Sequence, residues 1–167
     1  MNKAKLIIFM GISGSGKSSL ASRFADEFNY EFVEADDFHS QQAKALMSNN
    51  ITITDDMRQH WISRIIARLK LLNNHNVVMA YSGLKAAHRQ QFRQLDFDVS
   101  FIFLSGQEST ISHRLAQRNN HFVNQDFVGS QLNDLETPST EELDTHVVNI
   151  DQSLDDVYQS AKQLLSV

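Results

Sequence analysis

The chain has 167 residues, enough for one globular domain, and we expect residues 1–167 to form a single domain. Hydrophobic residues make up 41% of the sequence, which is typical of folded proteins and argues against disorder. The formal net charge of −5 argues against nucleic acid as a partner, and no apolar run approaches the roughly 18 residues of a membrane span.

The first predicted element is a buried strand at Leu6–Met10, which follows a short basic segment. This apolar run is shorter than the roughly 7–15 residues that the core of a secretory signal needs, so we expect a cytoplasmic protein. The chain has no cysteine, which excludes disulfides and thiolate metal sites.

Short apolar runs alternate with amphipathic segments along the rest of the chain. We predict five strands, at Leu6–Met10, Phe32–Ala35, Val77–Tyr81, Phe101–Leu104 and Val147–Ile150. We predict helices between and after them, at Lys17–Phe28, Asp55–Leu72, Leu84–Leu95, Gln107–Arg118 and Ser153–Leu165. Continuous apolar strands separated by helices indicate a parallel sheet covered on both faces. The predicted fold class is therefore α/β, a three-layer α/β/α domain with a five-stranded parallel sheet.

Local side chains mark helix starts and one irregular segment. Thr54 or Asp55 is expected to cap the long central helix, and Ser153 opens a sequence that approximates a capping box. Residues 119–136 are the least regular part of the chain, and we predict a small mobile lid there with a short helix at Gln125–Leu135.

The strongest motif is GISGSGKS at residues 11–18, which matches the G-x-x-x-x-G-K-[S/T] pattern of phosphate-binding loops (P-loops). It follows a predicted strand and opens a predicted helix, so backbone N–H groups and the helix N-terminus face a bound phosphate. Lys17 would reach the terminal phosphates, and Ser18 would offer an oxygen to Mg²⁺. A dinucleotide site is excluded because Ser19 stands where its third glycine is needed. We predict ATP and Mg²⁺ as cofactors, with nucleotide binding by Gly11, Ser13, Gly14, Ser15, Gly16, Lys17, Ser18, Ser19 and Arg114.

Three carboxylates stand at the end of the second predicted strand, at Glu34, Asp36 and Asp37. Open α/β sheets bind ligands beyond the carboxyl ends of their strands, so these acids would face the phosphates on the P-loop. We assign Asp36 to accept the proton of an attacking hydroxyl, and Glu34 to the metal shell beside Ser18. The alternative is a solvated acidic turn. No guanine-recognition motif is present, which favours a kinase over a GTPase switch.

Two arginines precede or open the lid. Arg114 and Arg118 are four residues apart and share a helix face. We predict that Arg118 is catalytic and neutralises charge on the transferring phosphoryl group. The alternative is that both arginines cover apolar surface with their stems.

Four motifs in this order resemble the bacterial-type gluconate kinases, of the shikimate- and nucleotide-kinase fold group. The family's D-G-D-x-x-H is similar to residues 34–39, and its D-x-D-R-x-P-W-L is similar to residues 55–62. Its C-S-A-L-K-x-x-Y-R resembles residues 81–89, and its lid motifs resemble residues 118–122 and 130–138. The similarity runs from Gly11 to Asp151, nearly the whole chain.

The resemblance implies ATP-dependent phosphorylation of the primary hydroxyl of gluconate, giving 6-phosphogluconate, by an enzyme that forms a homodimer. The catalytic residues are then Lys17, Asp36 and Arg118, and the acceptor is a sugar acid. Acceptor binding falls to Asp36, His39, Arg58, Lys85, Arg89, His121 and Gln131. Arginine and lysine in this set suit an anionic acceptor. Trp61 is assigned to packing.

The chain departs from the family pattern at Glu34, Ser40, Asn49–Asn50, His60 and Tyr81–Gly83. Nearly all of these positions belong to the acceptor side, whereas the ATP side is intact. Two alternatives therefore stay open: a kinase for another small hydroxylated acid, shikimate-like or another aldonate, and a non-catalytic nucleotide-binding module.

Overall fold

The computed structural model describes residues 2–117 and 125–166, and its centre is a parallel five-stranded sheet. The strands are β1 (Lys5–Met10), β2 (Glu31–Glu34), β3 (Val77–Tyr81), β4 (Asp98–Ser105) and β5 (Thr145–Asn149). They lie in the order β2-β3-β1-β4-β5, and every pairing is parallel. The predicted five-stranded parallel sheet is confirmed, with strand boundaries shifted by up to three residues.

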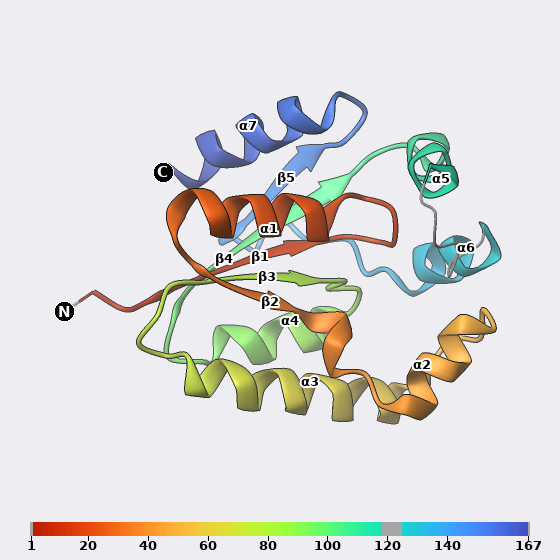
Figure 1. Ribbon diagram of the computed structural model, residues 1–167, viewed down its shortest axis with the longest axis horizontal. Coiled ribbons are helices and arrows are strands. Elements are labelled where there is room, and N and C mark those ends of the chain that lie inside the picture. The colour runs from red at the N-terminus through yellow and green to blue at the C-terminus, as the bar shows by residue number, and fades with distance from the viewer. Residues whose placement is uncertain (1, 118–124, 167) are drawn as a thin grey trace.

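Helices cover both faces of this sheet and its carboxyl edge (Figure 1). They are α1 (Lys17–Phe28), α2 (Gln41–Ser48), α3 (Asp55–Leu71), α4 (Ala86–Arg93), α5 (Glu108–Ala116), α6 (Gln125–Asp134) and α7 (Leu154–Leu165). Figure 1 shows α1 and α7 on one face, α3 and α4 on the other, and α2, α5 and α6 near the ends of the strand arrows. No helix among the described residues is long and apolar enough to cross a membrane.

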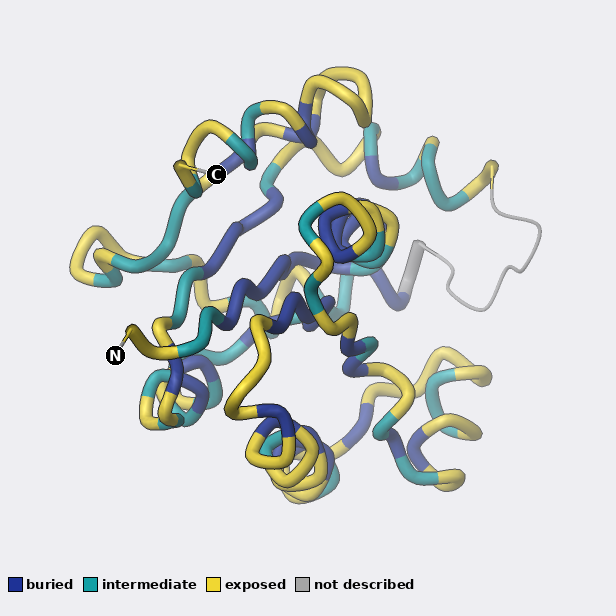
Figure 2. Tube along the Cα trace, turned by 60° about the vertical axis from the view of Figure 1, so that its left-hand side comes forward, coloured by how far each residue is buried: buried dark blue, intermediate teal, exposed yellow. Residues whose placement is uncertain are grey.

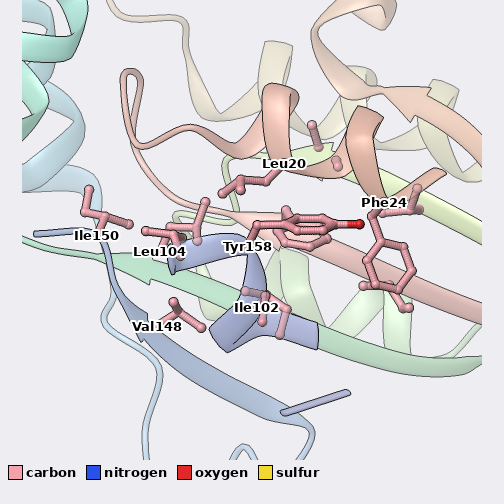
Figure 3. Close-up of a cluster of buried hydrophobic side chains, with 14 of the residues drawn as sticks. Leu20, Phe24, Ile102, Leu104, Val148, Ile150 and Tyr158 are labelled. Carbon is pink, nitrogen blue, oxygen red and sulfur yellow. The ribbon is translucent and has the colours of Figure 1, made fainter. Parts of the chain in front are cut away.

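The alternation of side chains along each strand divides the core between the two faces. In β1, Ile7 and Phe9 pack with α1 and α7, whereas Leu6, Ile8 and Met10 pack with α3 and α4. Figure 3 shows the first of these clusters, in which Leu20, Phe24 and Tyr158 lie over strand residues such as Ile102, Leu104 and Val148. The dark inner strands of Figure 2 show the same burial along the chain.

Side chains that cap helix N-termini are found at the two predicted positions and at one further position. Thr54 Oγ1 accepts the N–H of Met57 at 3.1 Å, and Ser153 Oγ accepts the N–H of Asp156 at 3.1 Å, as predicted. Ser40 caps α2 in the same way. Neither α2 nor the 3₁₀ turn η1 (Ala35–Phe38) before it was predicted, because both are too short to display a helical period.

A buried ion pair fixes the segment that returns from α6 to β5. Arg89 on α4 is 1% exposed, and its Nε and Nη2 donate to the carboxylate of Glu142 at 3.0 and 3.1 Å. Its Nη1 donates to the carbonyl of Gly83 at 2.7 Å. Burial alone would raise the pKa of Glu142, but the hydrogen bonds and charge of Arg89 outweigh it and hold that pKa below its ordinary value.

We expect Glu142→Gln to lower the free energy of unfolding at pH 7 by about 3 kcal/mol, because it leaves the buried Arg89 charge without a carboxylate. A lowered carboxyl pKa stabilises the fold above the unfolded-state pKa, and this contribution is lost as pH falls through the folded-state pKa. The difference between the two proteins should therefore shrink in urea titrations below about pH 4. Glu141→Gln, at an exposed neighbour, is the matched control, and equal stability of the two variants at pH 7 would contradict the prediction.

Candidate active site

The P-loop joins β1 to α1 at the carboxyl edge of the sheet. Gly14 has a φ of 85°, in the left-handed region, and a Cβ atom there would lie 2.8 Å from a leucine of α5. The N–H of Gly11 donates to the carbonyl of Ser82 at 3.1 Å, which ties the loop to the end of β3. Lys17, the first residue of α1, is buried. A loop that wraps the start of a helix beside a lysine is suited to bind an anion such as a triphosphate.

A pair of oxygen donors lies beside this loop. Ser18 Oγ donates to Glu34 Oε2 at 2.6 Å, and the N–H of Asp36 donates to Glu34 Oε1 at 3.4 Å. Burial raises the pKa of Glu34 above its ordinary value, although the Ser18 hydrogen bond opposes the shift. Mg²⁺ prefers oxygen ligands and takes only one or two from the protein when phosphates supply others. The residue types and spacing of Ser18 and Glu34 therefore fit a magnesium ion.

The chain after β2 forms the neighbouring wall with an aromatic stack. His39 lies on Trp61 with ring centroids 4.1 Å apart and planes 17° apart, and its Nε2 is 3.7 Å from Asp36 Oδ1. Trp61 Nε1 donates to the carbonyl of Ala35 at 2.6 Å, which fixes the indole plane. His39 Nδ1 is buried without a hydrogen-bond partner in the described part of the chain. The stack therefore fixes the imidazole ring of His39 beside the Asp36 carboxylate.

The P-loop and the chain after β2 both line one cavity, which has a volume of about 390 Å³. The P-loop contributes Ser13 and Lys17, and the chain after β2 contributes Asp36 and His39. Side chains of α2, α3 and α6 form much of the remaining wall. Sites for small metabolites have volumes of about 300–1,000 Å³, so the space suits a small polyhydroxylated molecule next to a phosphate.

The cations that were predicted to bind the acceptor lie in three different environments. Arg58 lines the cavity, but its Nη1 and Nη2 contact Asp55 and Asp134, each at 3.2 Å. Arg89 is held by Glu142 and Gly83 and is not among the described residues that line the cavity. Lys85, which precedes α4, is also outside this lining. The structure thus brings only Arg58 of the three to the cavity, because the other two belong to the start and inner face of α4.

Helix α6 contacts both ends of the site. Gln131 Oε1 accepts the N–H of Ser13 in the P-loop at 2.8 Å. Ser130 Oγ lies 2.6 Å from Thr52 Oγ1, in the segment before α3. Gln131, which was predicted to bind the acceptor, lines the cavity with its amide on the phosphate side.

The predicted nucleotide residue Arg114 joins the P-loop to the segment after β5. Its Nη1 donates to the carbonyl of Ser15 at 3.1 Å, and its Nη2 donates to the carbonyls of Ile150 and Gln152 at 2.9 and 3.1 Å. Arg118 and His121, predicted for catalysis and acceptor binding, lie outside the described residues.

Sequence reasoning missed one face of α2 and the position of Trp61. Lys44, Met47 and Ser48 line the cavity at the i, i+3 and i+4 positions of that helix. Ser40, followed by a run of helix-forming residues, was the available signal for α2. Trp61 packs in the core as expected and also lines the cavity.

Known proteins resemble this chain over most of its length. Residues 6–138 match the family model described as an AAA domain. A probable gluconokinase of Dictyostelium discoideum is 36% identical over 165 residues, which cover 92% of this chain and 82% of that protein. The thermoresistant gluconokinase of Escherichia coli (strain K12) is 31% identical, over 96% of this chain and 93% of that protein. The chain belongs to the gluconokinase family.

Two solved structures, of a gluconokinase and of a shikimate kinase, share the fold of this gluconokinase-family chain. The crystal structure of a gluconokinase from Sinorhizobium meliloti 1021 has a TM-score of 0.88 and 33% identity, over 99% of this chain and 94% of that chain. A shikimate kinase from Bacteroides thetaiotaomicron, 15% identical, has a TM-score of 0.70 over 99% of each chain and shares the fold. The predicted P-loop kinase fold and the predicted family are confirmed.

We expect Glu34→Gln to raise the melting temperature of the ligand-free protein at pH 7 by about 2 °C. A raised carboxyl pKa means that the favourable contribution of Glu34 is present below the unfolded-state pKa and is lost as pH rises through the folded-state pKa. At pH 7 the buried charge therefore costs stability, and a neutral side chain of the same length removes that cost. The gain should disappear near pH 4, where both side chains are neutral.

The same substitution should weaken the stabilisation that Mg-ATP gives, because a neutral amide is a poorer magnesium ligand. Thermal melts with and without Mg-ATP measure both effects. Glu31→Gln, on the same strand but exposed, is the control. A Glu34→Gln protein that is less stable at pH 7 and keeps its full response to Mg-ATP would refute this role.

Proposed function

We propose that this chain transfers the γ-phosphoryl group of ATP to the primary hydroxyl of D-gluconate, forming 6-phosphogluconate and ADP. The observation that carries the proposal is that Lys17 of the P-loop and Asp36 after β2 line the same cavity. Membership of the gluconokinase family and the similarity to named gluconokinases support gluconate as the acceptor. The resemblance also supports a homodimer, and a cytoplasmic location is the expected one for an ATP-dependent activity.

On the nucleotide side, backbone N–H groups of the P-loop and the start of α1 hold the phosphates, and Lys17 bridges the terminal ones. Ser18 and Glu34 would hold Mg²⁺, which supplies positive charge to the β- and γ-phosphates when it is bound. Arg118 is proposed to complete this charge from the lid side.

On the acceptor side, Asp36 accepts the proton of the hydroxyl as its oxygen bonds to the γ-phosphorus and the bond to the ADP oxygen breaks. His39 also lines the cavity next to Asp36, and we assign it to a second hydroxyl of the sugar acid. Gln131, at the P-loop wall, is positioned to contact the acceptor near the transferring group. Enclosure by α6 would limit the access of water, which otherwise hydrolyses ATP.

A coupled ADP-release assay against D-gluconate, other aldonates, shikimate and nucleoside monophosphates tests the proposal. We expect turnover with D-gluconate, and we expect Lys17→Ala to abolish it. Asp36→Asn should lower kcat by about 10²–10⁴-fold, because it removes the proton acceptor while keeping the size of the side chain.

Asp37→Asn, at the exposed adjacent carboxylate, should retain activity close to that of the unmodified protein. Turnover with another acid and none with D-gluconate would assign a different acceptor to the same chemistry. ATP binding without turnover of any acceptor would reject the kinase proposal in favour of a nucleotide-binding module.

A further inference from the structure

We propose that Lys44, on α2, binds the carboxylate of the acceptor and gives the enzyme its preference for an acid over an alcohol. This inference rests on the proposed function, because it names the group that recognises the acidic end of the sugar acid. Neither the family motifs nor the comparisons assign a role to this residue.

Arg58 is already surrounded by negative charge. Arg58 is 7% exposed, and its guanidinium contacts two carboxylates, those of Asp55 and Asp134. One positive and two negative charges leave a formal charge of −1 at this cluster. A further carboxylate would have to displace Asp134 or approach a net negative group, which is unfavourable in a partly buried site.

The remaining cations differ in whether they already have partners. Arg89 is occupied by Glu142 and by the carbonyl of Gly83. Lys17, Lys44 and Arg58 are the cations that line the cavity in the described part of the chain. Lys17 belongs to the phosphates. Lys44 takes part in no ion pair among the residues described, so it can give its whole charge to a ligand.

The position of α2 relative to the reacting hydroxyl decides which end of the acceptor Lys44 meets. A six-carbon aldonate carries its carboxylate and its primary hydroxyl at opposite ends of the chain. The hydroxyl must lie between Asp36 and the P-loop, so the carboxylate points to the part of the cavity away from the P-loop. Figure 1 shows α2 extending from the α3 side of the sheet, whereas the P-loop leads into α1 on the other side.

The face of α2 that carries Lys44 also supplies other residues of the cavity wall. Met47 and Ser48 line the cavity from the same face of α2, because they follow Lys44 by three and four residues, about one helical turn. The long stem of Lys44 can lie along Met47 while its amine reaches into the cavity, as lysine commonly does at apolar surfaces. The Lys44 side chain is exposed in the ligand-free protein, so it is not held in a buried contact before it meets the carboxylate.

The experiment compares the unmodified enzyme with Lys44→Met and Lys44→Arg. Lys44→Met keeps the length and the apolar stem of the side chain but removes the charge. We expect it to raise KM for D-gluconate about tenfold, the usual value of one charge-assisted hydrogen bond, with kcat and KM for ATP within about twofold. Lys44→Arg should restore most of the affinity, and Lys70→Met, at an exposed lysine of α3, should change nothing.

A second readout separates charge recognition from a change of cavity shape. D-glucitol replaces the carboxylate by a hydroxymethyl group, and its inhibition constant against D-gluconate should be the same in Lys44→Met and in the unmodified enzyme. Equal loss of affinity for both compounds would overturn the proposal, and so would an unchanged KM for D-gluconate.

The two proposals fail in different ways. If the unmodified protein phosphorylates a sugar acid other than D-gluconate, the acceptor assignment fails and the same Lys44 comparison is made with that acid. If it phosphorylates only uncharged acceptors, or none, the Lys44 proposal is overturned as well.

Discussion

The hydrogen-bonded register of the parallel sheet is the constraint on which the site depends. Met10 pairs with Tyr81 and Glu34 pairs with Ala80, so β1, β2 and β3 end at nearly the same level. Because the strands are parallel, the segments that follow them emerge on one edge. The P-loop and the acidic turn therefore face each other across β3, and the Ser18 hydroxyl reaches Glu34 at 2.6 Å. A slip of one residue in β2 would turn Glu34 to the other face and break this contact.

Helix α6 links the two halves that the sheet brings together. Gln131 accepts a hydrogen bond from the N–H of Ser13 on the phosphate side, and Asp134 forms an ion pair with the guanidinium of Arg58 on the acceptor side. A ligand oxygen that takes either position must compete with a side chain of the same helix. A ligand that binds at either end of the cavity therefore breaks a contact made by α6. The free energy of binding at each end includes the loss of that contact.

The sequence was sufficient for the parts of the structure that local patterns determine. The helix at Lys17–Phe28 and the strand at Val77–Tyr81 have the predicted boundaries, because apolar periodicity and the P-loop motif define them locally. The roles of the cations were not accessible in this way. Arg89 matches a motif that suggested acceptor binding, yet its partner Glu142 is 53 residues further along the chain. Only the fold shows which charges are already neutralised.

The residues that depart from the family pattern have different structural roles in the fold. His60 is exposed, with its side chain 70% accessible, and Ser40 caps α2. Asn50 takes a φ of 58°, a left-handed conformation that glycine otherwise provides. Tyr81 is 1% exposed and packs 5.2 Å from Trp61, so it supports the aromatic stack from behind and is not among the described cavity residues.

A change at Tyr81 thus reaches the acceptor only through the position of Trp61 and His39. The charge that an acceptor meets is set elsewhere, by the balance among Arg58, Asp134 and Lys44. An arginine that lines a cavity is not automatically a ligand for an acid, because each carboxylate that already contacts it reduces the field available to the substrate. In this protein two carboxylates do so at Arg58, whereas the lysine of a helix too short to be predicted keeps its charge for the ligand.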